Sequence, residues 1–135
     1  MATQITVNRE PDYSDIDLDF MRNPKTDQLI IKTGVEAIKR SVRNLLFTNN
    51  FERPFQSYIG SNVRALLFEN ADPFTAVRLK EAIEVCLNNF EPRISVQNVV
   101  VSEDIDNHAY NVRLEYIILN KELPVVQTVF LERIR

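Results

Sequence analysis

Between residues 34 and 90 the apolar residues recur every three or four positions, the spacing of helices that bury one face. A first helix is predicted to follow the capping-box pattern Thr33-Gly34-Val35-Glu36, and Ser61 is predicted to cap a short second helix. Asp72-Pro73 predicts the start of a third, which runs to Phe90. The predicted inward positions are Val35, Ile38, Val42, Leu45 and Leu46; Val63, Leu66 and Leu67; Leu79, Ala82, Ile83, Cys86, Leu87 and Phe90.

Beyond residue 93 the period of the apolar residues changes from helical spacing to strict alternation, which indicates strands with one buried face. Strands are predicted over 94–103, 108–119 and 125–134, with polar turns between them. The predicted fold class is therefore α+β: an irregular N-terminal segment, about three helices, and then a three-stranded antiparallel β-meander. We predict a single domain over residues 1–135, in which residues 1–30 form an extended N-terminal segment.

Pro92 marks the change from helices to strands, because it lacks an amide N–H and biases the preceding residue toward extended backbone. In extended backbone, residues two apart point to the same side, so Glu91 and Arg93 are predicted to present their charges together. This corner has two interpretations. It is either a helix stop with two solvated charges or a surface contact site.

Four segments at these spacings carry a resemblance to a known family. They are Tyr13-Ser14-Asp15-Ile16-Asp17, Glu52-Arg53-Pro54-Phe55, Leu67-Phe68-Glu69-Asn70 and Phe90-Glu91-Pro92-Arg93-Ile94. In that order they resemble the baseplate wedge family of contractile phage tails, which has relatives in type VI secretion baseplates. The resemblance implies a structural wedge subunit in the tail baseplate of a virion, assembled in the host cytoplasm. It also implies docking on larger wedge proteins and templating of the first ring of tail sheath subunits.

The candidate partner-binding residues lie in three places. The first is the corner, and the second is the loop that contains Arg53 and Phe55. The alternative for that loop is that Phe55 serves only to anchor it. The third is the last strand, which is apolar on both faces and is expected to accept a strand from a sheath subunit. The alternative for that strand is partial cover by the chain's own N-terminal segment. The candidates are Glu91, Pro92 and Arg93; Arg53 and Phe55; Val126, Thr128 and Phe130.

Alternating aspartates from Asp15 to Asp19 look like the start of a calcium loop, but the positions for glycine and for the closing acid hold Phe20 and Thr26. We therefore predict no metal site there. The segment is expected to be extended, with its apolar face formed by Ile16, Leu18 and Phe20.

Composition excludes several classes of function. The net charge of −3 gives no support for nucleic-acid binding, and no apolar run is long enough to cross a membrane. Two glycines, one cysteine and one histidine supply neither a phosphate-binding loop nor zinc-ligand spacing. We therefore expect no cofactor and no small-molecule substrate, and Cys86 is expected to be a core residue.

The alternative to a structural wedge subunit is an enzyme. A tail-associated, lysozyme-like peptidoglycan hydrolase would need two carboxylates, one of them in an apolar setting. The chain has 19 acidic residues, so a pair at a usable distance is no evidence, and no acid lies in an apolar run. We predict that the protein is not an enzyme. A bacterial regulatory adaptor of the same fold is a third, weaker option.

Overall fold

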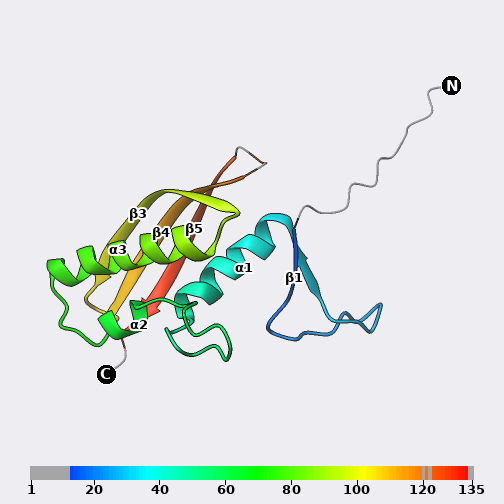
Figure 1. Cartoon of the computed structure of the whole chain (residues 1–135), viewed down its shortest axis with the longest axis horizontal. Coiled ribbons are helices and arrows are strands. Elements are labelled where there is room, and N and C mark those ends of the chain that lie inside the picture. The colour runs from blue at the N-terminus through cyan, green and yellow to red at the C-terminus, as the bar shows by residue number, and fades with distance from the viewer. Residues whose placement is uncertain (1–12, 120, 122, 134–135) are drawn as a thin grey trace. The chain divides into compact units, whose positions relative to one another are not determined.

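The computed structural model describes residues 13–119, 121 and 123–133, and the predictions that fall on residues 1–12 and 134–135 lie outside them. The chain divides into two compact parts, residues 1–38 and 39–135, with the helix α1 (Gly34–Phe47) running from one into the other. Figure 1 shows the order of the elements along the chain. The interpretation of residues 1–135 as one domain stays a prediction.

The described residues of the N-terminal part form a two-stranded antiparallel ribbon. β1 (Ser14–Ile16) pairs with β2 (Ile31–Thr33). The expected apolar face is wrong: β1 ends at Ile16, Phe20 has a positive φ of 50°, and Ile16, Leu18 and Phe20 are exposed. The residue that is buried is Asp17, whose carboxylate lies 3.6 Å from the Lys32 ammonium. The segment thus buries a charged residue and exposes its apolar ones, against its hydrophobic pattern.

The three predicted helices are present. α1 begins directly after Thr33, as its capping pattern predicted. α2 (Val63–Leu66) buries Val63 and Leu66 as expected, but the predicted cap is wrong. Asn62 occupies the cap position without a side-chain bond, and Ser61 donates its hydroxyl to the Leu46 carbonyl at 2.7 Å.

α3 (Pro73–Phe90) begins and ends where the sequence predicts. The Asp72 carboxylate accepts a 2.6 Å hydrogen bond from the Thr75 amide, and Pro73 occupies the first turn. α3 lies across one face of the sheet and packs against β3 (Figure 1). The buried residues on α3 include Cys86, as expected for a core position.

The C-terminal sheet is the predicted meander. β3 (Ile94–Asp104), β4 (Ala109–Ile118) and β5 (Pro124–Glu132) pair antiparallel in the order β3-β4-β5, with a bulge at residue 97 in β3. The central strand β4 is buried on the predicted face: Tyr110, Val112, Leu114, Tyr116 and Ile118. β3 and β5 are the two edges of this sheet, so their outer backbone groups lie beyond its hydrogen-bond ladder.

Candidate functional site

The corner after α3 holds a bidentate ion pair. The helix ends at Phe90, and Glu91 has a non-helical backbone with φ −124° and ψ 81°. Arg93 donates from Nε and Nη2 to the two carboxylate oxygens of Glu91, at 2.6 Å and 2.8 Å. The Ser41 hydroxyl, on α1, donates to Glu91 Oε2 at 2.6 Å. The predicted same-side arrangement of Glu91 and Arg93 is therefore confirmed, and a third residue joins the pair.

The carboxylate of this pair is not at the surface, which corrects the expected solvent-facing pair. Glu91 is 3% exposed, whereas the Arg93 side chain is 26% exposed and Pro92 is exposed. Burial alone raises the pKa of the Glu91 carboxyl, but the hydrogen bonds from Arg93 and Ser41 outweigh it and hold the pKa below its usual range. Only Pro92 and the outer part of Arg93 are therefore left for a partner to touch.

Ser41 was missed by sequence reasoning, although a signal for it exists. It lies on α1 beside the buried Ile38, Val42 and Leu45, so it is a polar residue within an apolar stripe. Such a residue needs a buried partner, because an unbonded hydroxyl in an apolar setting is unfavourable. The sequence gives no indication that this partner is 50 residues away.

The loop over residues 50–59 is closed tightly at its base. The Ser61 amide donates to the Thr48 carbonyl at 2.8 Å, and a Cβ on Gly60 would lie 2.6 Å from the Asn49 carbonyl carbon. Gly60 is therefore required for close backbone approach. Phe55 is fully exposed with a φ of 67°, so the alternative in which it anchors the loop is wrong. Arg53 is also exposed.

The outer edge of β5 can be assigned residue by residue. The Arg133 amide donates to the His108 carbonyl at 3.0 Å, and the β4–β5 register continues that pairing. Hydrogen-bonded and non-hydrogen-bonded pairs alternate in antiparallel ladders, so Val125, Gln127, Val129 and Leu131 bond to β4. The amides and carbonyls that face away from β4 belong to the intervening residues Val126, Thr128 and Phe130.

The residues that face away from β4 also present exposed side chains. Val126 is 49% exposed and Phe130 is 48% exposed, whereas Val129 and Leu131 are buried. None of the three outward amides donates to the backbone of another element within the described part of the chain. The predicted strand with two apolar faces is thus confirmed as an edge of the sheet, and within the described part of the chain no strand pairs with its outer side.

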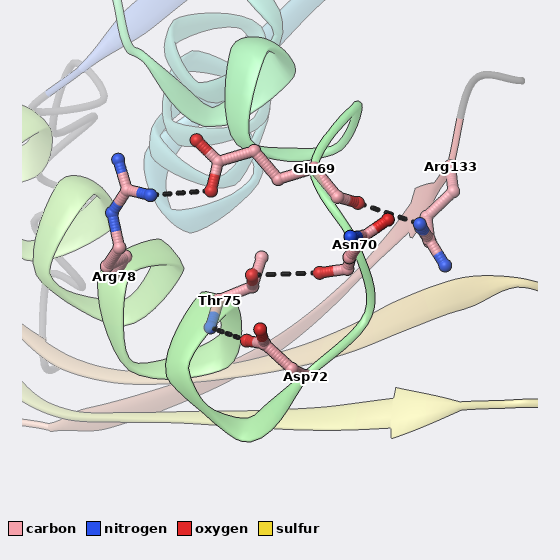
Figure 2. Close-up of polar contacts among 6 residues, drawn as sticks. All are labelled: Glu69, Asn70, Asp72, Thr75, Arg78 and Arg133. Atoms are coloured by element: carbon pink, nitrogen blue, oxygen red, sulfur yellow. Dashed lines mark hydrogen bonds and ion pairs between the residues drawn. The ribbon is translucent and has the colours of Figure 1, made fainter.

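The loop between α2 and α3 ties the helices to the end of β5 (Figure 2). Arg133 donates from Nη2 to the Glu69 carbonyl at 2.7 Å, while the Glu69 carboxylate pairs with Arg78 at 2.5 Å. The Thr75 hydroxyl donates to the Asn70 carbonyl at 2.9 Å. The segment Leu67-Phe68-Glu69-Asn70, which carried part of the resemblance, therefore holds the end of β5 in place.

Comparison with known proteins decides the family. The family model of baseplate wedge protein gp25 matches residues 32–122. Baseplate wedge protein gp25 of Enterobacteria phage T4 is 31% identical over 108 residues, which are 80% of this chain and 81% of that protein. The chain belongs to the gp25 family of baseplate wedge proteins. It is a structural subunit of a contractile-tail baseplate and is located in the virion tail, which confirms the resemblance.

Solved structures share the fold of this gp25-family chain at low sequence identity. A protein of Geobacter sulfurreducens, provisionally named a tail lysozyme, aligns with a TM-score of 0.73 at 18% identity, over 80% of this chain and 98% of its own. A chain of the anti-feeding prophage baseplate aligns with a TM-score of 0.63 at 20% identity, over 91% and 87%. A chain of the post-contraction pyocin R2 baseplate aligns with a TM-score of 0.53 at 19% sequence identity, over 82% of this chain and 96% of its own.

Three features of the described residues in this gp25-family subunit concern metals, membranes and thiol chemistry. The described residues contain no group of three or more His, Cys, Asp or Glu side chains that could hold a metal ion. Among them, no helix is long and apolar enough to cross a membrane. Burial raises the pKa of the Cys86 thiol to about 11, so the reactive thiolate is scarce at neutral pH.

Proposed function

We propose that this gp25-family subunit initiates the tail sheath by accepting an extended arm from the first ring of sheath subunits along the outer edge of β5. The observation that carries the proposal is the row of outward backbone groups at Val126, Thr128 and Phe130. An open edge of this kind recruits another strand unless charges or prolines block it, and Pro124 stands only at its beginning.

The side chains of β5 suit such an addition. Backbone pairing supplies affinity with little demand on sequence, and alternate side chains supply the selectivity. Val126 and Phe130 are about half exposed and would be covered further by a neighbouring strand. A rigid sheet edge would then set the position of the first sheath ring.

Docking on larger wedge proteins uses other surfaces in this proposal. The corner contributes Pro92 and the exposed part of Arg93, while Glu91 orients the guanidinium from its buried position. The loop contributes Arg53 and Phe55, which project from a base held by backbone hydrogen bonds. Exposed aromatic and arginine side chains are the types that dominate the energy of protein interfaces.

Hydrogen exchange on baseplates before and after sheath assembly tests the proposed strand addition. We expect the amides of Val126, Thr128 and Phe130 to exchange quickly without sheath and to be protected in the sheathed tail. The amides of Val125, Gln127 and Val129 bond to β4 and serve as internal controls, protected in both states. Equal protection of the outward amides in both states would overturn the proposal, and it is the result expected if the chain's own N-terminal segment covers the edge.

A hydrolase is the second candidate, because the fold is shared with a protein provisionally named a tail lysozyme. A general acid for glycoside hydrolysis needs a raised pKa, whereas Arg93 and Ser41 hold the pKa of Glu91 down. Incubation with purified cell wall separates the two functions: turnover that Glu91→Gln abolishes would establish the enzyme. The genes that neighbour the coding sequence would distinguish a regulatory adaptor from a tail protein.

A further inference from the structure

A groove of about 450 Å³ opens beside the C-terminal end of β5. Arg43 and Phe47 of α1, Arg64 and Leu67 at α2, and Phe130 and Glu132 of β5 contribute to its walls. Its residues thus come from α1, from α2 and the residue that follows it, and from the last three residues of β5. The groove lies where an added strand would leave the edge.

The charge of the groove favours an acidic occupant. Neither Arg43 nor Arg64 forms an ion pair with a carboxylate in the described part of the chain, although Glu132 lines the same groove. The Arg43 guanidinium instead lies 5.7 Å from the centre of the Phe47 ring. Two arginines against one glutamate leave one excess positive charge beside apolar walls, where a carboxylate gains most from bidentate hydrogen bonding.

The register of β5 fixes which side chains of an added strand enter the groove. Residues directly opposite each other in paired strands point to the same face of a sheet. Leu131 is buried toward the helices, so the residue opposite it on an added strand also points toward them. That residue would meet Phe47 and Leu67, and its neighbours on the same face would reach the arginines.

We propose that this groove selects the arm that pairs with β5, by taking one large apolar side chain together with an aspartate or glutamate within two residues of it. The occupant is an extended segment of the sheath subunit. This inference rests on the proposed function, since it names the chemistry of the partner at the same edge. It adds a requirement that backbone pairing alone does not impose.

Charge reversal in the groove tests the requirement for an acidic residue. Baseplates are assembled with the full chain carrying Arg43→Glu and Arg64→Glu, and the sheath concentration for half-maximal assembly is measured at low and high salt. We expect a loss of about tenfold or more at low salt, with most of the salt dependence gone. Lys80→Glu with Lys121→Glu changes the net charge equally at residues that do not line the groove and should assemble normally.

A photo-crosslinking residue in place of Phe47 identifies the occupant directly. The expected product joins this position to a sheath segment that has an acidic residue within two positions of the linked one. The same photo-crosslinking residue at Val85, exposed on α3, is the control and should not capture that segment. A linked sheath segment without an acidic residue in that window would overturn the inference.

The two proposals fail in distinguishable ways. If sheath assembly leaves the outward amides of β5 unprotected, strand addition fails and the groove loses its occupant. If those amides are protected but the doubly reversed variant assembles with unchanged concentration and salt dependence, only the groove inference fails. Should the reversed variant fold poorly, the neutral pair Arg43→Gln and Arg64→Gln gives the same readout, and retained salt dependence there counts against the groove.

Discussion

The carboxylate of Glu91 accepts side-chain hydrogen bonds from Arg93 Nε, Arg93 Nη2 and the Ser41 hydroxyl. The pair joins the helix-to-strand corner to α1, two segments that are distant in sequence. Because hydrogen bonds between a guanidinium and a carboxylate are charge-assisted and strong, the carboxylate contributes to stability as well as to the orientation of Arg93.

Glu91→Ala is therefore expected to destabilise the protein by about 1.5–3 kcal/mol, because it removes the charged acceptor of the hydrogen bonds from Arg93 and Ser41. This differs from the solvated pair that the sequence alone allowed. Urea unfolding measures the change, with Glu81→Ala on the exposed side of α3 as the control. An unfolding midpoint equal to that of the wild type would show that the buried pair contributes nothing to stability.

The same carboxylate predicts a dependence of stability on pH. Its pKa in the folded protein lies below the unfolded value of 4.5, so the stabilisation is complete above pH 4.5 and is lost as the pH falls through the folded pKa. Glu91→Gln removes this contribution. The difference in unfolding free energy between wild type and variant should therefore be largest near neutral pH and shrink in acid, and a difference that grows in acid would contradict the assignment.

Cys86 is expected to behave as a core residue. Its Sγ lies 3.5 Å from the Gly60 carbonyl oxygen, too far for a serine hydroxyl, which prefers about 2.7–2.8 Å. Cys86→Ser should cost about 1–3 kcal/mol, since the hydroxyl would be buried without a well-placed acceptor. Thiol labelling of the native protein should be slow, and rapid labelling without unfolding would show that this face of α3 opens to solvent.

At the scale of elements, the proposed strand addition would divide the positions of β5 between folding and assembly. Alternate residues of β5 bond to β4, and in the proposal the intervening residues bond to the sheath arm. The base of the 50–59 loop shows a similar division, because the backbone contact at Gly60 holds the loop while its exposed side chains are left for other contacts.

Proline substitution along β5 distinguishes the two purposes. Thr128→Pro removes an outward amide and should leave the unfolding free energy within about 1 kcal/mol of wild type while blocking sheath initiation. Val129→Pro removes an amide that bonds to β4, so it should destabilise the sheet by about 1–3 kcal/mol. Thermal unfolding and sheath assembly on baseplates measure the two effects, and normal assembly by Thr128→Pro would exclude pairing at that position.

At the scale of the whole molecule, membership of the gp25 family places these surfaces in a tail baseplate. The proposed contacts then divide between two kinds of neighbour, wedge proteins at the corner and loop, and sheath at β5. Mutation of one surface should leave the other contact intact.

Arg53→Ala combined with Phe55→Ala tests that division. Both side chains are exposed, so the double variant should unfold at the wild-type temperature. Its incorporation into baseplates should fall, because truncating aromatic and arginine contacts at an interface costs about 2 kcal/mol or more for each residue that is central. Incorporation equal to that of Gln56→Ala, an exposed neighbour in the loop, would remove this surface from the proposal.

The sequence by itself determined the order of helices and strands, the switch at Pro92, the cap at Asp72 and the buried face of β4. These follow from local chemistry: residue spacing reports which face is apolar, and proline or a capping carboxylate acts on its immediate neighbours. The resemblance likewise depended on short segments in a fixed order. The α+β fold and the family could therefore be predicted from the sequence.

Only the tertiary structure decided which side chains are paired, buried or free. The buried Glu91 accepts a hydrogen bond from Ser41, 50 residues away, and Gln127 donates to the Lys39 carbonyl from 88 residues away. The apolar Phe55 is exposed and the charged Asp17 is buried, the reverse of what their hydrophobicity predicts. The groove beside β5 brings together residues from three elements. The spacing of apolar residues along a chain shows which face of a helix or strand is buried. It does not show which residues become partners, because partners are set by packing between segments that are distant in sequence.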